Sequence, residues 1–408
     1  MENLLKFIIE HADSDVSRLL LDRKKYPGID IDLAVNCIES RRKLKGKVQE
    51  WYDEPELIFP LKLSAEQCSS SATGRYKADL AGRIAGSGDW IIADLTGGLG
   101  VDSWFFSRNA SRVIYNEMKS ELCDAARHNF AILGANNIEI SNRTAASGNI
   151  GDILSFDGRA DIVYLDPARR GEGGKKVFLI EECTPDILTL KDEIFRHTRN
   201  ILIKLSPMAD ISMVCERLGS TCREVHIVSA GGECKELLIW MDREWNSEYS
   251  VTAIELHNGS TYASFHFNYS EERSALPITG LRSDAVFLFE PGKSLMKAAA
   301  YNLLSKRFNI AKLGKSTHYY TTNDMDTVEN LKELGKIYKI LEYHPLDKRS
   351  IRETAEKYPK SEVTARNIPM DTGTLRKKLG VSSGDDAHIF GLKSDVEGNL
   401  LIIAKRVF

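Results

Sequence analysis

Three acidic residues in the first half of the sequence each stand at the end of an apolar run. Asp94 ends IIAD, Glu117 ends VIYNE and Asp166 ends DIVYLD. Short apolar runs of this kind predict buried strands of a parallel sheet. Because ligands of such sheets bind outside the carboxyl ends of the strands, we expect the three carboxylates to converge on one crevice.

A glycine-rich turn follows the first of these strands. It comprises Thr96, Gly97, Gly98, Leu99 and Gly100, and a helix is expected directly after it. Glycine lets the main chain pass close to a ligand, so the segment is typical of a loop that holds a nucleoside cofactor. A glycine turn between a strand and a helix is common in α/β proteins. The prediction of a cofactor loop therefore depends on the turn and the acidic strand ends occurring together in this order.

The residues around the turn favour S-adenosyl-L-methionine over NAD. A dinucleotide places its pyrophosphate over such a turn, where Asp94 would repel it by a few kcal/mol at about 4 Å and an effective dielectric near 20. The third glycine of the dinucleotide fingerprint is also absent, and Ser103 follows the turn instead. The sulfonium and ammonium groups of S-adenosylmethionine suit an acid here. Glu117 can bind the ribose hydroxyls of either cofactor.

Length and composition indicate an ordinary soluble protein of several domains. The chain has 408 residues, 42% hydrophobic and 28% charged, and no apolar run long enough to span a membrane. Seven scattered cysteines without a Cys-x-x-Cys pair, and histidines without ligand spacing, argue against a disulfide framework and a metal site. We expect a cytoplasmic protein without a resident metal; the oligomeric state stays open.

The charge is unevenly distributed along the chain. Residues 301–408 carry 19 Lys+Arg and 14 Asp+Glu, an excess of +5, so the net charge of −3 leaves −8 for the first 300 residues. A basic end on an acidic body suggests a polyanionic partner such as RNA. A solvated charged surface explains the same numbers equally well.

Periodicity predicts four regions along the chain. We expect a helical domain over 1–75, an alternating α/β domain over 76–245, a β-rich extension over 246–325 and a small α/β module over 326–408. Within them, helices are predicted at 78–84 and 293–308. The runs near 225 and 236 are too close together for a crossover helix, so the last strand of the α/β domain must run antiparallel.

With these features the chain resembles bacterial class I S-adenosylmethionine-dependent methyltransferases that carry a C-terminal THUMP-like domain. The segments that carry the resemblance span most of the chain: DLTGGLG at 94–100, DPARR at 166–170, KLSPM at 204–208, GGECKE at 231–236, TARN at 364–367 and LRKKL at 375–379. It implies a seven-stranded, doubly wound, Rossmann-like sheet, an N-terminal helical segment and small C-terminal α+β domains, with a ferredoxin-like insert near 285–322. It also implies methylation of structured RNA, transfer or ribosomal, on a base. THUMP-type modules usually precede the catalytic domain, and here the module follows it.

The catalytic residues expected from this resemblance are Asp166, Pro167 and Arg169. Methyl transfer from a sulfonium is an in-line displacement in which positioning is most of the work. The Asp166 carboxylate and the Pro167 carbonyl can accept the hydrogens of an exocyclic amine, which is the favoured acceptor. Many amine methyltransferases continue with a second proline and an aromatic residue, whereas this chain has Ala168 and Arg169. An arginine plane can stack on a flipped base, or Arg169 and Arg170 can hold phosphates.

The remaining site residues are predicted from position alone. Asn142, near the end of the third strand, is a candidate to contact the adenine of the cofactor. Lys204, Glu233 and Lys235 are expected at later strand ends, where catalysis and structural ion pairing are equally compatible with their types. Three alternatives stay open: a methyltransferase for a small molecule or a protein, a noncatalytic RNA-binding scaffold, and an NAD-linked oxidoreductase.

Overall fold

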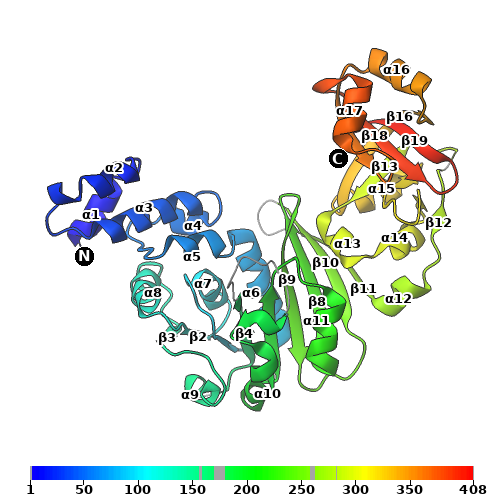
Figure 1. Ribbon diagram of the computed structural model, residues 1–408. Helices are drawn as coiled ribbons and strands as arrows, with labels where there is room; N and C mark the ends of the chain where they lie inside the picture. The colour runs from blue at the N-terminus through cyan, green and yellow to red at the C-terminus, as the bar shows by residue number, and fades with distance from the viewer. Residues whose placement is uncertain (1, 156–158, 170–179, 258–261, 282, 408) are drawn as a thin grey trace. The chain divides into compact units, whose positions relative to one another are not determined.

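The computed structural model describes residues 2–155, 159–169, 180–257, 262–281 and 283–407 (Figure 1). The prediction that Arg170 holds a phosphate concerns a residue that lies outside these ranges. The described residues fall into two compact units. The first comprises the described residues of 2–225 and 236–248, and the second comprises the described residues of 226–235, 249–257 and 262–407.

The first unit begins with helices, as predicted. They are α1 (Glu2–Glu10), α2 (Val16–Leu21), α3 (Ile31–Leu44), α4 (Gln49–Tyr52) and α5 (Lys62–Gln67), with a short 3-10 helix at Arg23–Lys25. Asp15 and Asp30 cap α2 and α3 by accepting hydrogen bonds from free backbone amides of the first turn. These caps, which satisfy amides that have no partner within the helix, set where the two helices begin.

Helix α6 (Ser71–Ala85) is longer than the predicted 78–84. Ser70 and Thr73 form a capping box, in which each side chain bonds the backbone of the other residue, and this starts the helix seven residues early. The polar stretch before residue 78 is therefore mostly helical. Its consequence for the site is that Lys77 is carried on a helix.

Gly74 gives a direct test of how α6 packs on α7 (Val101–Ser107). A Cβ at Gly74 would lie 2.2 Å from the Phe105 ring, whereas a Cβ at Gly82 in the same helix would meet nothing nearer than 3.9 Å. Alanine is the better helix former by about 1 kcal/mol. Gly82→Ala is therefore expected to stabilise the protein by about 0.5–1 kcal/mol, and Gly74→Ala to destabilise it by about 1–3 kcal/mol through overpacking. Denaturant unfolding of both variants checks this; equal effects would contradict the packing.

The larger sheet has the strand order β11-β10-β8-β9-β7-β4-β1-β2-β3. Its strands are β1 (Ile91–Asp94), β2 (Arg112–Asn116), β3 (Ile138–Ser141), β4 (Ile162–Leu165), β7 (Asn200–Leu205), β8 (Cys222–Ala230), β9 (Glu233–Asp242), β10 (Ser250–Leu256) and β11 (Tyr262–Asn268). Strands β1, β2, β3, β4 and β7 pair in parallel, and β9 runs antiparallel to β7 as predicted. Seven strands thus have the expected doubly wound arrangement, and β10 and β11 extend the sheet.

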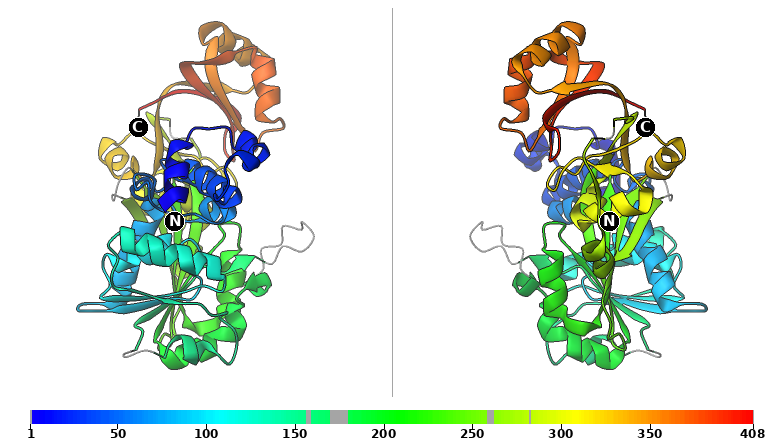
Figure 2. Two further views of the ribbon diagram at one scale, coloured as in Figure 1. Left: turned by 90° about the vertical axis from the view of Figure 1, so that its left-hand side faces the viewer. Right: turned by 90° about the vertical axis from the view of Figure 1, so that its right-hand side faces the viewer.

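Helices cover both faces of the parallel strands. Beside α6 and α7 they are α8 (Ser120–Ile132), α9 (Ile150–Ile153), α10 (Ile187–His197) and α11 (Ile211–Leu218). In Figure 2 the blue-to-cyan helices lie on one side of the sheet and the green helices on the other. Strand β4 is buried along its whole length, which explains its continuous apolar sequence.

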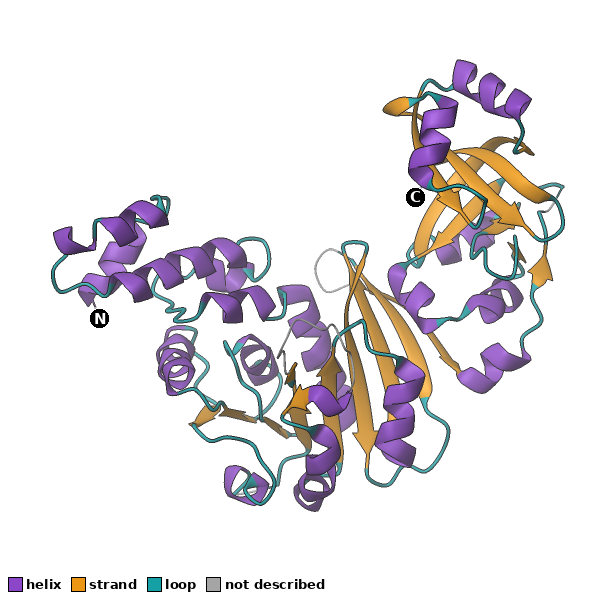
Figure 3. Ribbon diagram, viewed as in Figure 1, coloured by secondary structure: helices purple, strands orange, loops and turns teal. Residues whose placement is uncertain are grey.

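The second unit contains a sheet of order β12-β14-β15-β13-β16-β19-β18-β17 (Figure 3). Its strands are β12 (Ile278–Thr279), β13 (Phe287–Pro291), β14 (Ala311–Lys312), β15 (Tyr320–Thr322), β16 (Gly335–Pro345), β17 (Lys360–Arg366), β18 (Ser382–Ser394) and β19 (Gly398–Arg406). Its helices are α12 (Tyr269–Ser274), α13 (Lys293–Ala298), α14 (Tyr301–Phe308), α15 (Met325–Leu331), α16 (Lys348–Lys357) and α17 (Thr372–Leu379). The mixture of helices and strands confirms the predicted α+β character.

The prediction of a single helix over 293–308 is wrong in one respect, because the segment forms two helices, α13 and α14. Ala299 has a φ of 57°, in the left-handed region, and this ends α13 before α14 begins. The apolar spacing is nearly continuous across the break, so periodicity alone gave no sign of it.

In the described part of the chain, no helix is long and apolar enough to cross a membrane.

Candidate active site at the carboxyl ends of the parallel strands

The structure brings the three acidic strand ends together around the glycine turn. Thr96 links two of them, because its hydroxyl donates to Asp94 Oδ1 (3.4 Å) and accepts from the Asp166 amide (2.6 Å). The third is joined through Gly98, whose amide donates to Glu117 Oε2 at 2.9 Å. The predicted convergence of Asp94, Glu117 and Asp166 is therefore seen in the geometry.

The three glycines of the turn are required for two physical reasons, close packing and backbone conformation. A Cβ at Gly97 would lie 2.2 Å from the Tyr115 ring, and one at Gly100 would lie 2.7 Å from Phe130. Those two glycines let the turn pack on the aromatic residues behind it. A Cβ at Gly98 would meet nothing nearer than the Thr96 carbonyl at 3.7 Å, although its φ of 54° still favours glycine. The open side of the turn is therefore at Gly98.

Four of the five backbone amides of the turn are already engaged. Thr96 donates to Asp94 Oδ1 (3.0 Å), Gly97 to the Asn116 carbonyl (2.8 Å), Gly98 to Glu117 and Gly100 to the Gly97 carbonyl (2.9 Å). An anion site at a helix start needs free amide donors. With four of these amides used and carboxylates on the adjoining strand ends, the turn suits a cationic ligand better than it suits a pyrophosphate.

Asp94 is the most deeply buried of the three carboxylates, with 1% of its surface exposed. Ser103 Oγ donates to its Oδ2 at 2.6 Å, so the serine that replaces the third fingerprint glycine binds this acid. Burial raises the pKa of Asp94 to about 7, and the neighbouring Asp102 and Asp166 add to the rise, which the bonds from Ser103 and Thr96 oppose. Asp94 thus titrates near neutral pH.

Glu117 is held from two sides but keeps acceptor capacity. Its Oε1 accepts from the Lys119 amide at 2.9 Å and its Oε2 from Gly98. Each carboxylate oxygen has a second lone pair, so a ribose hydroxyl can still be bound. Asn142 lies beside it and donates from Nδ2 to the Glu117 backbone carbonyl at 2.7 Å.

The Asp166 loop lies at the end of β4. Lys204 Nζ contacts Asp166 Oδ2 at 2.6 Å, Asp166 is half-buried and Pro167 is buried. Arg169 belongs to β5 (Ala168–Arg169), a short strand that pairs antiparallel with β6 (Cys183–Thr184). The side chain of Arg169 lies outside what the structure describes.

Sequence reasoning missed a buried ionic cluster beneath this loop. Lys77 Nζ on α6 contacts both Glu236 oxygens (2.8 and 2.9 Å), Asp102 Oδ1 (3.3 Å) and Ser69 Oγ (2.8 Å). Asp102 Oδ2 also accepts from the Tyr164 hydroxyl at 2.8 Å. Lys77 and Glu236 are 159 residues apart in sequence, so no local spacing indicated this pair.

Glu233 and Lys235 form an ion pair with each other, which is one of the two alternatives that the sequence left open for them. Lys235 Nζ contacts Glu233 Oε2 at 2.7 Å, and both side chains are largely exposed. An exposed pair of this kind contributes little to stability. The geometry gives neither residue a place among the hydrogen bonds of the glycine turn.

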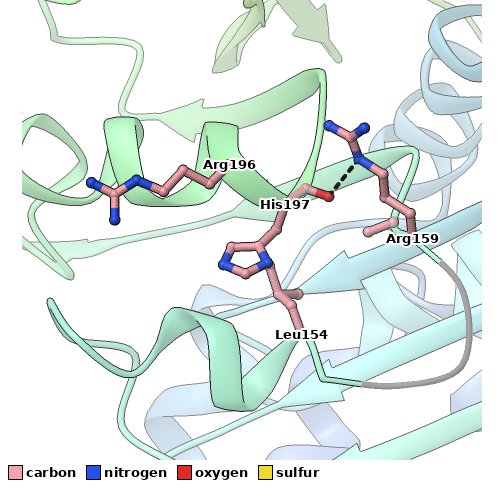
Figure 4. A pocket seen from close by; sticks show the side chains of 5 residues that line it. Leu154, Arg159, Arg196 and His197 are labelled. Atoms are coloured by element: carbon pink, nitrogen blue, oxygen red, sulfur yellow. Dashed lines mark hydrogen bonds between the residues drawn. The ribbon is translucent and has the colours of Figure 1, made fainter.

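A separate hollow of about 220 Å³ lies at the opposite edge of the sheet (Figure 4). It is lined by Leu154, Arg159, Ala160, Arg196 and His197, and Arg159 Nε donates to the His197 carbonyl at 3.0 Å. Ala160 precedes β4 and His197 ends the helix before β7, so this hollow adjoins the amino ends of the strands. It is not part of the site at the carboxyl ends.

Over the residues the structure describes, no cluster of three or more His, Cys, Asp or Glu side chains is suited to a metal ion.

Comparison with known proteins identifies two segments of the second unit. Residues 287–327 match the model of a ferredoxin-like domain, and residues 335–406 match the model of a THUMP domain-like family. No curated protein is significantly similar to the chain in sequence. The two matches agree with the insert and the C-terminal module that the resemblance implied.

Solved structures match the chain over different lengths. A protein from Porphyromonas gingivalis W83, described as a "putative methyltransferase", is 27% identical with a TM-score of 0.86, covering 100% of this chain and 98% of that chain. The human methyltransferase 10 domain containing protein (11% identity, TM-score 0.38) covers 50% and 96%, and an rRNA methylase from Streptococcus thermophilus (12% identity, TM-score 0.30) covers 41% and 93%. Only the match to the Porphyromonas gingivalis protein, which extends over the whole chain, is used to assign the fold. Together with the strand order of the larger sheet, it confirms the predicted class I methyltransferase fold.

Proposed function

We propose that the chain, which has the class I methyltransferase fold and a C-terminal THUMP-like domain, is a methyltransferase that transfers a methyl group from S-adenosylmethionine to a base of structured RNA. The observation that carries the cofactor proposal is the set of carboxylates, Asp94, Glu117 and Asp166, that surrounds a glycine turn in which four of the five amides are engaged. Such a turn fits a sulfonium and ribose hydroxyls better than it fits phosphates.

The residues proposed to hold the cofactor are those around the turn. Asp94 and Asp166 provide negative charge, and Glu117 accepts ribose hydroxyls, with Asn142 placed beside it. Gly98 leaves the approach to the turn open. The turn itself is fixed by Thr96, Gly97 and Gly100. The bound cofactor supplies an electrophilic methyl group on a sulfonium. Everything else is positioning by the protein.

For the acceptor we propose an exocyclic amine. The Asp166 carboxylate and the Pro167 carbonyl accept its two hydrogens and so direct its lone pair toward the methyl donor. Pro167 has no N–H that would compete for these acceptors. Arg169 is proposed to stack on the flipped base or to bind a phosphate.

The RNA partner is supported by the C-terminal part of the chain. It includes the THUMP domain-like match and carries the excess of five positive charges in residues 301–408. On α17, Lys377 and Lys378 are exposed, while Arg376 contacts Glu362 at 2.9 Å. Exposed lysines on one short helix are suited to phosphate contacts.

Incubation with labelled S-adenosylmethionine and total RNA from a strain that lacks this protein tests the proposal. Nucleoside mass analysis is expected to find one methylated base, made by the wild type and not by Asp166→Ala. Parallel incubations with RNA-free protein and small-molecule extracts separate the other acceptors. Product in those fractions alone would replace RNA as the substrate, and RNA binding without product in any fraction would favour a scaffold.

Donor affinity is expected to depend on pH through Asp94. Below pH 7 the carboxyl gains a proton and loses its charge, so the affinity for S-adenosylmethionine should fall, approaching tenfold per pH unit. The demethylated product has the same amino group but no sulfonium, and its affinity should change less. Calorimetry between pH 5.5 and 8.5 checks both ligands. An equal pH dependence for the two would show that Asp94 does not sense the sulfonium.

A further inference from the structure

The buried ionic cluster contains two lysines with different surroundings. Lys77 is fully buried and its ammonium is surrounded by Glu236, Asp102 and Ser69. Lys204, on β7, contacts Asp166, the acid that faces the crevice, at 2.6 Å. Among the described residues, Asp166 is the hydrogen-bond partner of the Lys204 ammonium.

The electrostatics keep Lys204 charged despite its burial. Burial by itself lowers its pKa, but Asp166, Asp102 and Glu236 together outweigh that effect and raise the pKa above its usual range. The pKa of Asp102 is lowered, because Lys77 and Lys204 outweigh the effect of its burial. Lys204 is therefore a cation that contacts Asp166 and also interacts electrostatically with the buried Asp102 and Glu236.

Stability alone gives no strong reason for such a cluster. Buried ion pairs contribute little net stability, because desolvation of the charges offsets most of their attraction. The partner of Lys204 is also not fully buried: the Asp166 side chain is 37% exposed, against 14% for Lys204. A carboxylate in that position would be hydrated and free to rotate if Lys204 did not hold it.

We propose that Lys204 is a positioning residue that fixes the Asp166 carboxylate through Oδ2 and leaves Oδ1 to accept a hydrogen of the acceptor amine. This rests on the proposed function and deepens it. Thr96 holds the backbone of Asp166 from the other side, through the 2.6 Å bond to its amide. Main chain and side chain of Asp166 are thus fixed independently, which is what a near-attack geometry requires.

The first test is structural and needs no activity. Crystal structures of the wild type and of Lys204→Met, both without acceptor, are compared at the Asp166 side chain. The wild type should show the Nζ–Oδ2 contact, and the variant should show the carboxylate turned away or in several rotamers. An unchanged Asp166 rotamer in Lys204→Met would overturn the proposal. Lys204→Gln serves as a second variant, with thermal unfolding to confirm that each is folded.

The second test is a double-mutant cycle on methyl transfer to RNA. Lys204→Met is expected to lower kcat about 50-fold with donor affinity within about threefold of wild type, and to lower it less than about twofold in an Asp166→Asn background. Lys62→Met is the control: it breaks the Lys62–Glu39 contact of 2.7 Å in the N-terminal helices and should leave kcat unchanged. Additive losses would show a merely structural role and refute the proposal.

Failure of the proposed function has a different signature. If the wild type transfers no methyl group to RNA, the substrate proposal is wrong. The crystal comparison still decides whether Lys204 positions Asp166, because it depends on neither donor nor RNA.

Discussion

Replacing Asp166 with asparagine is expected to lower kcat for methyl transfer about 1,000-fold, or about 4 kcal/mol, while donor affinity stays within about tenfold. The asparagine has nearly the same shape, but its amide group carries no charge. It would also weaken the contact with Lys204, which holds the carboxylate at 2.6 Å. The loss should appear in kcat because the proposed bonds to the acceptor amine align the reacting atoms.

Single-turnover kinetics measures this effect, with the unmethylated form of the RNA that the labelling experiment identifies as the substrate. Asp152→Asn is the matched control, since Asp152 lies 3.9 Å from Arg143 and both side chains are largely exposed. The control should behave as wild type. Retention of more than a tenth of the wild-type rate by Asp166→Asn would remove Asp166 from the proposed mechanism.

The second large effect is expected for Asp94→Asn. Loss of the charge should weaken binding of S-adenosylmethionine about 100-fold or more, since opposite charges about 4 Å apart at an effective dielectric near 20 attract by about 4 kcal/mol. The demethylated product lacks the sulfonium, so its affinity should fall only about tenfold or less. Asparagine can still accept the hydrogen bond from Ser103, which lies 2.6 Å from Asp94.

Calorimetry at pH 8, where Asp94 is ionised, measures both affinities in wild type and variant. The informative quantity is the ratio of the two losses, because a local packing defect would weaken both ligands equally. Equal losses, or no loss for the donor, would mean that Asp94 does not face the sulfonium. Thermal unfolding of Asp94→Asn serves as the folding control.

The sequence predicted the parts of the site that are fixed by strand topology. Asp94, Glu117 and Asp166 were expected to meet because each follows a parallel strand, and parallel strands end at one edge of a sheet. The antiparallel β9 was predicted from a gap too short for a crossover helix. Both inferences use only order along the chain and the geometry of sheets.

Residues brought in by tertiary packing could not be predicted in the same way. Lys77 reaches the cluster on a helix that precedes β1, and Glu236 reaches it on the antiparallel β9. Neither has a spacing relation to the glycine turn. The break at Ala299 was hidden for a related reason: a single left-handed residue interrupts the helix without interrupting its apolar pattern.

The most direct measurement of the central claim is calorimetry of the wild-type protein with S-adenosylmethionine, its demethylated product and NAD. Carboxylates around a turn in which four of the five amides are engaged predict saturable binding of the first two ligands and none of NAD. Binding of NAD in preference to S-adenosylmethionine, or no binding of the methyl donor or its product, would contradict the account.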